Sequence, residues 1–260
     1  MINIRSEKEI EGIRAACRLT ADAMEVAADM VMPGAGTDDI SDAVRSFIES
    51  KGGKAAFLGY DGFPGAICLS LNDEVVHGIP GDRTISEGDL VKVDLGAYIG
   101  GYYGDMARTF AVGDVSDEVM SLVEVTRESF FRGMSQAVHG KHTGDLGFAI
   151  QSYVEEHGFS VVRALVGHGI GRNLHEEPQV PNFGRPGRGY SLRQGMVLAV
   201  EPMVNMGAYN VDTLDDDWTV VTSDGSLSAH YENTIVVRDD YPEILTLMSG
   251  EEELWQKTTL

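Results

Sequence analysis

The sequence predicts one α+β domain in which helices cover one face of a sheet, and three observations carry this prediction. Helix-like segments come in two pairs, and each pair is followed by a run of short β-rich segments. Hydrophobic residues make up 43% of the 260 residues, which is enough for a sizeable core. No linker-like stretch divides the chain, so we predict a single domain over residues 1–260.

The first predicted helix pair lies near the start of the chain. Ser6 and Glu9 form a capping-box pattern ahead of residues 10–31, where apolar side chains recur at helical spacing. A Pro-Gly pair ends this segment. Thr37 or Asp38 can cap a second, shorter helix, which a Gly-Gly pair ends.

The second predicted pair repeats this order. Ser116 caps a long segment that continues to Val138, where a His-Gly pair breaks it. Thr143 opens a shorter helix that ends at Gly158.

Strands are predicted in the remaining parts of the chain. The segments richest in β-formers are Ala66–Leu71, Leu90–Leu95, Thr109–Val112, Ser160–Arg163, Met196–Val200, Thr219–Thr222 and Thr234–Val237. Each half therefore contains a long helix, a short helix, a glycine stop and strands, in that order. This repetition predicts an internal duplication, with halves at roughly 1–113 and 114–260; chance recurrence is the alternative.

The charge balance argues against several functions. The chain has 20 Lys+Arg and 41 Asp+Glu, a net charge of −21, and such a surface repels nucleic acid and anionic membranes. Charges near the N-terminus interrupt any apolar segment, so no secretory signal is expected, and no apolar run has the length of a membrane span. The cysteines, Cys17 and Cys68, are too few for a disulfide framework. We therefore expect a cytoplasmic protein.

Four carboxylates and one histidine stand in strand-like or glycine-flanked surroundings. These residues are Asp94, Asp105, His168, Glu201 and Glu232. An ionised carboxylate inside an apolar strand is costly unless something compensates its charge. A helix cap, a buried salt bridge or a strand end explains any one of them alone. The four together call for a common counter-charge.

Divalent metal ions are the counter-charge that we predict. Lys92 and Arg108 are the nearest basic residues in the sequence, and they are too few to pair with all four carboxylates. Two divalent ions would balance four carboxylates. One imidazole among oxygen ligands suits Mn, Fe, Co or Zn more than a thiolate-type zinc site. Two ions about 3.5–4 Å apart are a known arrangement in aminopeptidases and other hydrolases.

Two further histidines are placed for acid–base or hydrogen-bonding work. His77 lies between a β-rich run and a glycine turn, and His175 follows His168 by seven residues. The remaining histidines are interpreted as structural or surface groups: His139, His142, His157 and His230. A serine nucleophile has no support, because the chain contains no GxSxG motif.

Several segments together resemble the type I methionine aminopeptidases over almost the whole chain. They are NDEVVHGIP, VKVDLG, GYYGDMARTF, GHGIGRNLHEEPQVPNF, GMVLAVEPMV and DDDWTVVTSDGSLSAHYENTIVV. The resemblance implies the pita-bread (creatinase/aminopeptidase) fold, in which two halves related by a pseudo-twofold axis place helices over a curved antiparallel sheet. Type I follows from length, because 201 − 168 = 33 positions between His168 and Glu201 leave no room for the type II insertion. We also expect that the chain begins directly at the catalytic domain.

The resemblance also implies the site residues. The metal ligands would be Asp94, Asp105, His168, Glu201 and Glu232. His77 and His175 would contact the substrate and assist catalysis. The wall of the methionine pocket would be Tyr60, Phe63, Cys68 and Trp218, with Phe57 and Leu174 beside them. Asn72 and Ser228 resemble members of a monovalent-cation site, which leaves such a cation open as an additional cofactor.

Six positions depart from the bacterial pattern of this family without changing a ligand. Phe57 stands in place of Cys, Phe63 in place of Tyr, Leu174 in place of Phe, Asp61 in place of His, His230 in place of Gln and Asn233 in place of His. These changes bear on fine specificity and on the response to inhibitors, not on the reaction.

The implied reaction is removal of the initiator methionine from nascent proteins, with a small second residue preferred. A metal-bridging water, acidified to hydroxide, would attack the scissile carbonyl, and Glu201 would shuttle its proton to the leaving amine. His175 would stabilise the tetrahedral intermediate and His77 would position the substrate. We expect a monomer that meets polypeptide N-termini, including those at the ribosome, and that binds neither nucleic acid nor membrane.

Two alternatives remain open. One is a related pita-bread hydrolase that acts on Xaa-Pro bonds or on creatine, although such enzymes usually carry an additional N-terminal domain. The other is a metal-free binding module, against which the five intact ligand positions argue.

Overall fold

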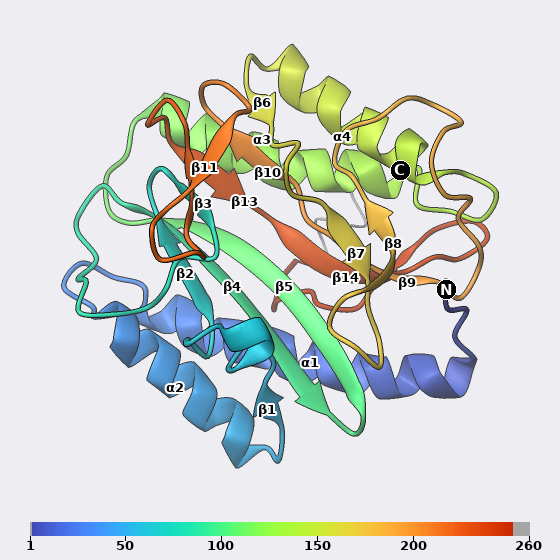
Figure 1. Ribbon diagram of the computed structural model, residues 1–260, viewed down its shortest axis with the longest axis horizontal. Coiled ribbons are helices and arrows are strands. Elements are labelled where there is room, and N and C mark those ends of the chain that lie inside the picture. Colours follow the sequence, from blue (N-terminus) through green and yellow to red (C-terminus); the bar gives the residue numbers. More distant parts are fainter. Residues whose placement is uncertain (1, 252–260) are drawn as a thin grey trace.

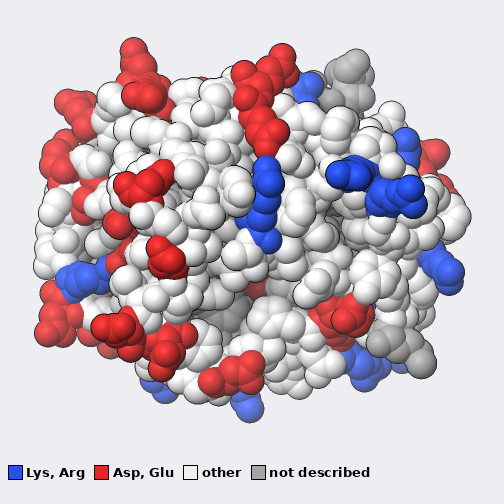
Figure 2. Space-filling model, turned by 45° about the horizontal axis from the view of Figure 1, so that its top comes forward, with Lys and Arg blue, Asp and Glu red and all other residues white. Residues whose placement is uncertain are grey.

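A nine-stranded antiparallel sheet and four α-helices dominate residues 2–251, which the computed structural model describes (Figure 1). Residues 1 and 252–260, which the predicted domain includes, lie outside this description. Within the described part, no helix has the length and apolar character needed to cross a membrane. On the face in Figure 2, acidic side chains are widespread and basic ones are fewer, in line with the net charge of −21.

The helices form two pairs, as predicted: α1 (Glu7–Met30) with α2 (Thr37–Ser50), and α3 (Asp117–Met134) with α4 (Thr143–Glu156). The capping box of Ser6 and Glu9 begins α1, because the Ser6 hydroxyl accepts from the backbone N–H of Glu9 and the Glu9 carboxylate accepts from that of Ser6. Ser116 caps α3 in a similar way, through the N–H of Val119.

Two predicted helix boundaries are wrong. Thr37 and Asp38 do not cap α2: Gly36 is the N-cap residue, and the Thr37 hydroxyl donates instead to the carbonyl of Gly81. Helix α3 stops at Met134 and does not reach Val138, since Val138 pairs with Arg238 as an isolated bridge. The spacing of apolar residues could not show that residues 135–138 leave the helix and that Val138 pairs with a segment 100 positions later.

The large sheet has the strand order β1-β4-β5-β14-β9-β7-β8, with β2 also paired to β4 and β15 to β14. Its strands are β1 (Lys54–Ala55), β2 (Cys68–Leu71), β4 (Leu90–Ile99), β5 (Tyr102–Ala111), β7 (Gly167–Gly169), β8 (Glu176–Val180), β9 (Val197–Val200), β14 (Glu232–Val236) and β15 (Glu243–Ile244). Two three-stranded sheets flank it, β13-β10-β6 and β11-β12-β3. Their strands are β3 (Glu74–Val76), β6 (Ser160–Val161), β10 (Met203–Asn205), β11 (Val211–Thr213), β12 (Val220–Thr222) and β13 (Ser228–His230).

The hairpin of β4 and β5 is longer than the sequence predicted. The expected strand Thr109–Val112 is only the end of β5, which begins at Tyr102 and pairs along its whole length with β4. Gly100 and Gly101 make the turn with φ of 63° and 91°, values that favour glycine. Glycine and aspartate inside β5 weakened the sequence pattern, because both residue types are depleted in strands.

Side-chain alternation gives the large sheet an apolar face and a polar face. Val93 and Leu95 of β4 pack into one core cluster with α1 and α2, and Leu198 and Ile235 pack into another with α3. Successive strand residues point to opposite faces, so Asp94 between Val93 and Leu95 points away from the helices. The sheet therefore presents its carboxylates on the face that the helices leave open.

The two parts of the chain contribute opposite sides of this sheet. Strands β1, β2, β4 and β5 come from the first 113 residues, the other strands come from the rest of the chain, and the two sets meet where β5 pairs with β14 (Figure 1). Each part also supplies one helix pair. Two helix pairs beside one large antiparallel sheet agree with the predicted α+β architecture. The exact boundaries of the two halves stay a prediction.

Candidate active site

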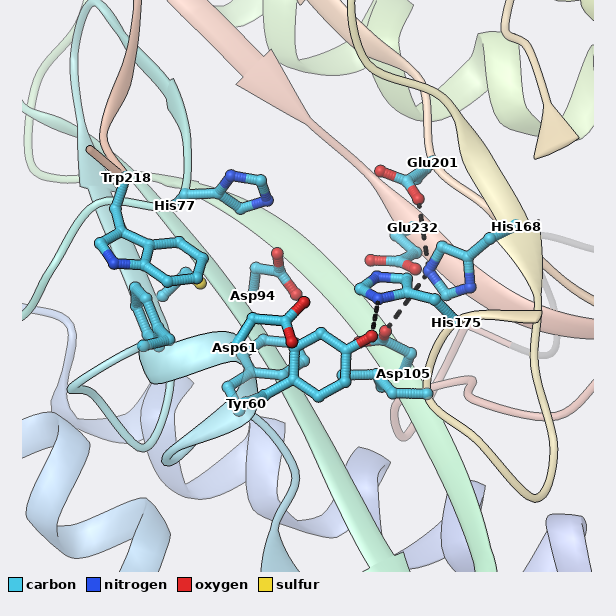
Figure 3. A pocket seen from close by; sticks show the side chains of 14 residues that line it. Tyr60, Asp61, His77, Asp94, Asp105, His168, His175, Glu201, Trp218 and Glu232 are labelled. Carbon is cyan, nitrogen blue, oxygen red and sulfur yellow. Dashed lines mark hydrogen bonds and ion pairs between the residues drawn. The ribbon is translucent and has the colours of Figure 1, made fainter. Parts of the chain in front are cut away.

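One cavity of about 190 Å³ opens on the side of the sheet that the four α-helices leave open, next to the short 3-10 helix η1 (Tyr60–Gly62) (Figure 3). All thirteen residues predicted to hold metal or substrate line it, and Asp61 completes the lining. The residues are Phe57, Tyr60, Asp61, Phe63, Cys68, His77, Asp94, Asp105, His168, Leu174, His175, Glu201, Trp218 and Glu232. The fold thus brings positions up to 175 residues apart in the sequence into one site.

Strand register places the predicted metal ligands side by side. Asp94 of β4 lies opposite Ala107 of β5, and Ala107 lies opposite Glu232, the first residue of β14. His168 in β7 lies opposite Ala199 in β9, so its imidazole faces the end of that strand, where Glu201 follows. Five neighbouring strands therefore direct carboxylates and an imidazole toward one site.

The distances between these groups suit shared coordination. His168 Nε2 lies 3.8 Å from Asp105 Oδ2 and 3.7 Å from Glu201 Oε1. One ligand atom each from Asp105, His168 and Glu232 lies within 4.8 Å of the others. Buried oxygens Oδ1 of Asp94, Oδ1 of Asp105 and Oε1 of Glu232 have no hydrogen-bond partner among the described residues. Burying acceptors without a partner is costly, and a bound cation would compensate them, so the residues fit a metal centre.

Burial gives the carboxylates unusual electrostatics. It raises the pKa of Asp94 to about 7 and the pKa of Asp105, Glu201 and Glu232 well above the ordinary range, and neighbouring carboxylates raise the last three further. Burial also lowers the pKa of His168 to about 3, with His175 adding to the effect. A neutral imidazole can bind a metal ion directly. A divalent ion would also stabilise the ionised form of the carboxylates, which burial disfavours.

The nearest basic residues do not supply the missing charge. The Lys92 ammonium donates to the backbone carbonyl of Asn72 at 2.7 Å. The Arg108 guanidinium donates to the backbone carbonyl of Glu232 and forms its ion pair with Glu251. Within residues 2–251, neither forms an ion pair with the four clustered carboxylates, which leaves their charge for a metal.

An apolar wall adjoins the carboxylate cluster. The rings of Phe63 and Trp218 pack edge to face with centroids 5.1 Å apart, and both line the cavity. The opposite side carries the pair of Tyr60 and His175, whose hydroxyl oxygen and Nδ1 lie 2.7 Å apart. His77 has φ of 60°, a strained conformation for a residue other than glycine, and its imidazole points into the cavity (Figure 3).

Sequence reasoning gave no site role to two residues that the structure places at or beside the cavity. Asp61 lines the cavity with φ of 47°, and it had been noted only as a departure from the family pattern. His230 had been interpreted as a structural histidine, yet its Nε2 lies 3.9 Å from Glu201 Oε2. The spacing of His230 two residues before Glu232 was the available signal, since alternate strand residues share a face.

The predicted monovalent-cation residues lie together. The carbonyl of Asn72 accepts from the backbone N–H of Ser228 at 3.1 Å and from the Lys92 ammonium at 2.7 Å. A protein cation therefore already contacts this carbonyl oxygen. Binding of a monovalent cation here stays a prediction.

The sheet with its buried carboxylate–histidine cluster defines a class of protein, the metal-dependent hydrolases. The model of metallopeptidase family M24 matches residues 11–239, and the chain belongs to this family. It is 51% identical over 248 residues to a methionine aminopeptidase of Clostridium acetobutylicum, covering 95% of this chain and 99% of that one. It is 46% identical to methionine aminopeptidase 1 of Bacillus subtilis, again covering 95% and 99%.

Solved structures agree with this assignment. The crystal structure of the methionine aminopeptidase from Rickettsia prowazekii superposes with a TM-score of 0.93 at 44% identity, covering 95% of this chain and 100% of that one. The prolidase from Pyrococcus horikoshii superposes with a TM-score of 0.77 at 24% identity, over 95% of this chain and 64% of that one. The second comparison shows a shared fold alone.

Proposed function

We propose that this protein removes the N-terminal initiator methionine from newly made proteins by metal-dependent hydrolysis. One observation carries the proposal: a buried cluster of four carboxylates and a histidine borders an apolar pocket in a chain that is 51% identical to a methionine aminopeptidase. Nascent polypeptide N-termini are the proposed substrates, with a small second residue preferred. A monomeric state, a cytoplasmic location and encounters at the ribosome belong to the same proposal.

The metal centre in this proposal holds two divalent ions, Co, Mn, Fe or Zn. The residues that would hold them are Asp94, Asp105, His168, Glu201 and Glu232. When bound, such ions polarise carbonyl groups and lower the pKa of water. The unpartnered oxygens of Asp94 and Asp105 and the neutral imidazole of His168 support this assignment.

The protein's own groups would move the proton and hold the substrate. Glu201 would accept a proton from the attacking water and deliver it to the leaving amine, because its buried carboxyl group has a raised pKa and lies at the cavity. His175 would stabilise the negative oxygen of the tetrahedral intermediate. His77 faces the cavity from the opposite side and would contact the scissile amide.

The apolar wall would select the methionine side chain. Phe63 and Trp218 line this wall with Tyr60 and Cys68, and Phe57 and Leu174 complete it. Methionine is unbranched and polarisable, so it can enter a narrow slot and make sulfur–aromatic contacts. A β-branched side chain is stiff and bulky next to the backbone, so it should fit poorly.

Peptide hydrolysis under one metal condition tests this function. We would compare kcat/KM for Met-Ala-Ser, Leu-Ala-Ser, Ile-Ala-Ser and an Xaa-Pro peptide. The proposal predicts the highest value for Met, a lower one for Leu because an apolar pocket discriminates by only about 1–3 kcal/mol per methylene, and very little cleavage of Ile. Equal values for Met and Ile would indicate a broad aminopeptidase, and a preference for Xaa-Pro would indicate a prolidase-like enzyme.

A further inference from the structure

The two glutamates of the proposed metal centre lie where two chain segments pass from the large sheet into a small one. β9 ends at Val200 and β10 begins at Met203, so Glu201 lies between them. β13 ends at His230 and β14 begins at Glu232. The pairs β9–β14 and β10–β13 lie in different sheets, and Met203 lies opposite His230. This crossover brings Glu201, His230 and Glu232 together.

The backbone of His230 is hydrogen-bonded on both sides, but the nitrogens of its buried ring are not. The Thr109 hydroxyl accepts from the N–H of His230 and donates to its carbonyl, each at 2.8 Å. The side chain is 1% exposed, and neither Nδ1 nor Nε2 has a hydrogen-bond partner among the described residues. Burying an imidazole with two unpartnered nitrogens is costly, so such a group in a native site calls for a function.

The Nε2 atom of His230 points to that function. It lies 3.9 Å from Glu201 Oε2 and 4.0 Å from Glu232 Oε2, nearly midway between two proposed metal ligands. An N–H···O bond is about 1 Å shorter than these separations, so a small turn of either carboxylate forms one. An imidazole ring carries at least one N–H that can donate.

We propose that His230 is a positioning residue of the metal centre, whose Nε2–H donates to Glu201 and Glu232 and holds their carboxylates in the orientation that binds metal. This inference rests on the proposed function, since it takes both glutamates as ligands. Outer groups that hydrogen-bond to ligands typically change metal affinity about 10–100-fold. His230 would act in this way without touching the substrate, because it is absent from the lining of the cavity.

Calorimetric titration of the metal-stripped full chain with Mn²⁺ at one pH tests the proposal. His230→Leu removes the donor, and we expect it to weaken Mn²⁺ binding by about 10–100-fold. His230→Gln keeps an N–H donor, so its affinity should stay close to that of the unmodified protein. Val204→Ala is the matched control, because Val204 lies in the core beside Met203 and is fully buried. It should lower the Tm and leave Mn²⁺ affinity unchanged.

The outcomes separate the possible errors. Unchanged affinity in His230→Leu overturns the role of His230, as does a loss in Val204→Ala equal to that in His230→Leu. Equal losses in His230→Gln and His230→Leu also overturn it, because a direct ligand would behave that way. Failure of the unmodified chain to bind Mn²⁺ would instead refute the metal centre itself.

A second measurement uses the unmodified protein, so it does not require any variant to fold. Nitrogen NMR of the histidine rings in the cadmium-loaded, unmodified protein should show a protonated Nε2 on His230 and coupling to cadmium on His168. Coupling between cadmium and the His230 ring would overturn the proposal in favour of direct ligation.

Discussion

At the scale of single residues, the proposed chemistry depends most on Glu201. Its carboxyl group lies at the cavity, 3.7 Å from His168 Nε2, with a pKa raised by burial and by Asp94. Glu201→Gln keeps the shape and removes both a ligand charge and the proton acceptor. We expect kcat to fall about 10²–10⁴-fold while the fold is retained. Circular dichroism and metal analysis are the controls, and unaltered turnover at full metal occupancy would exclude this role for Glu201.

His175 is the residue assigned to the tetrahedral intermediate. Its ring packs against that of His168 with centroids 4.3 Å apart, and burial lowers its pKa, so it is placed beside the metal ligands as a neutral donor. Because the contact forms mainly in the transition state, His175→Ala should lower kcat more than it raises KM. Tyr60→Phe serves as the control for loss of the Tyr60–His175 contact alone. A change confined to KM would make His175 a ground-state binding residue.

At the scale of elements, local sequence signals account for the helix starts. The capping box of Ser6 and Glu9 satisfies two backbone N–H groups at the first turn of α1. Ser6→Ala should therefore lower the free energy of unfolding by about 0.5–2 kcal/mol. Ser50→Ala, at the last residue of α2, is the control serine and should change the free energy of unfolding by less than about 0.5 kcal/mol. Denaturant unfolding followed by circular dichroism measures both, and equal effects would refute the cap.

Several strands that sequence reasoning missed have too little local pattern. Strands β7, β10 and β13 have three residues each, which is too short for apolar–polar alternation to be visible. They exist because partners distant in the chain pair with them. The long β5 was shortened to its last residues because Gly104 and Asp105 are poor strand formers.

The strength of the local sequence signal also decided which site residues could be predicted. Asp94 was visible because a carboxylate inside an apolar strand needs a counter-charge, and the family resemblance supplied the companion ligands and the pocket wall. The one local signal for His230, its spacing two residues before Glu232, does not show that Glu201 lies beside them. His230 lies near Glu201 because two chain segments cross between sheets at Pro202 and Tyr231. In the folded chain these residues meet, and the Tyr231 N–H donates to the Pro202 carbonyl.

At the scale of the whole molecule, the carboxylate cluster links stability to pH. Burial raises the pKa of Asp94 to about 7 and that of Glu232 well above the ordinary range in metal-free protein. The folded state then holds protons that the unfolded chain releases near pH 4, so stability falls as pH rises from that region toward neutrality. We expect the Tm of metal-stripped protein to fall between about pH 5 and about pH 7. Metal-loaded protein should not show this loss, because the ion replaces the protons.

The control for this dependence is Asp94→Asn in metal-stripped protein. Removing one buried titrating group should flatten the fall in Tm without abolishing it, since other carboxylates remain. Buried His168 and His230, whose pKa burial lowers to about 3, act in the opposite direction over this range, so the comparison with Asp94→Asn isolates the carboxylate. A fall in Tm that Asp94→Asn leaves unchanged would contradict the titration of Asp94.

Metal removal and replacement test the central claim most directly. Release of methionine from Met-Ala-Ser would be followed in chelated protein, with elemental analysis of the same sample, and again after Mn, Co or Fe is added back. The four-carboxylate, one-imidazole cluster predicts that chelation abolishes activity and that at least one of these ions restores it. Full activity in protein that elemental analysis finds free of metal would contradict the metal-dependent hydrolysis proposed here.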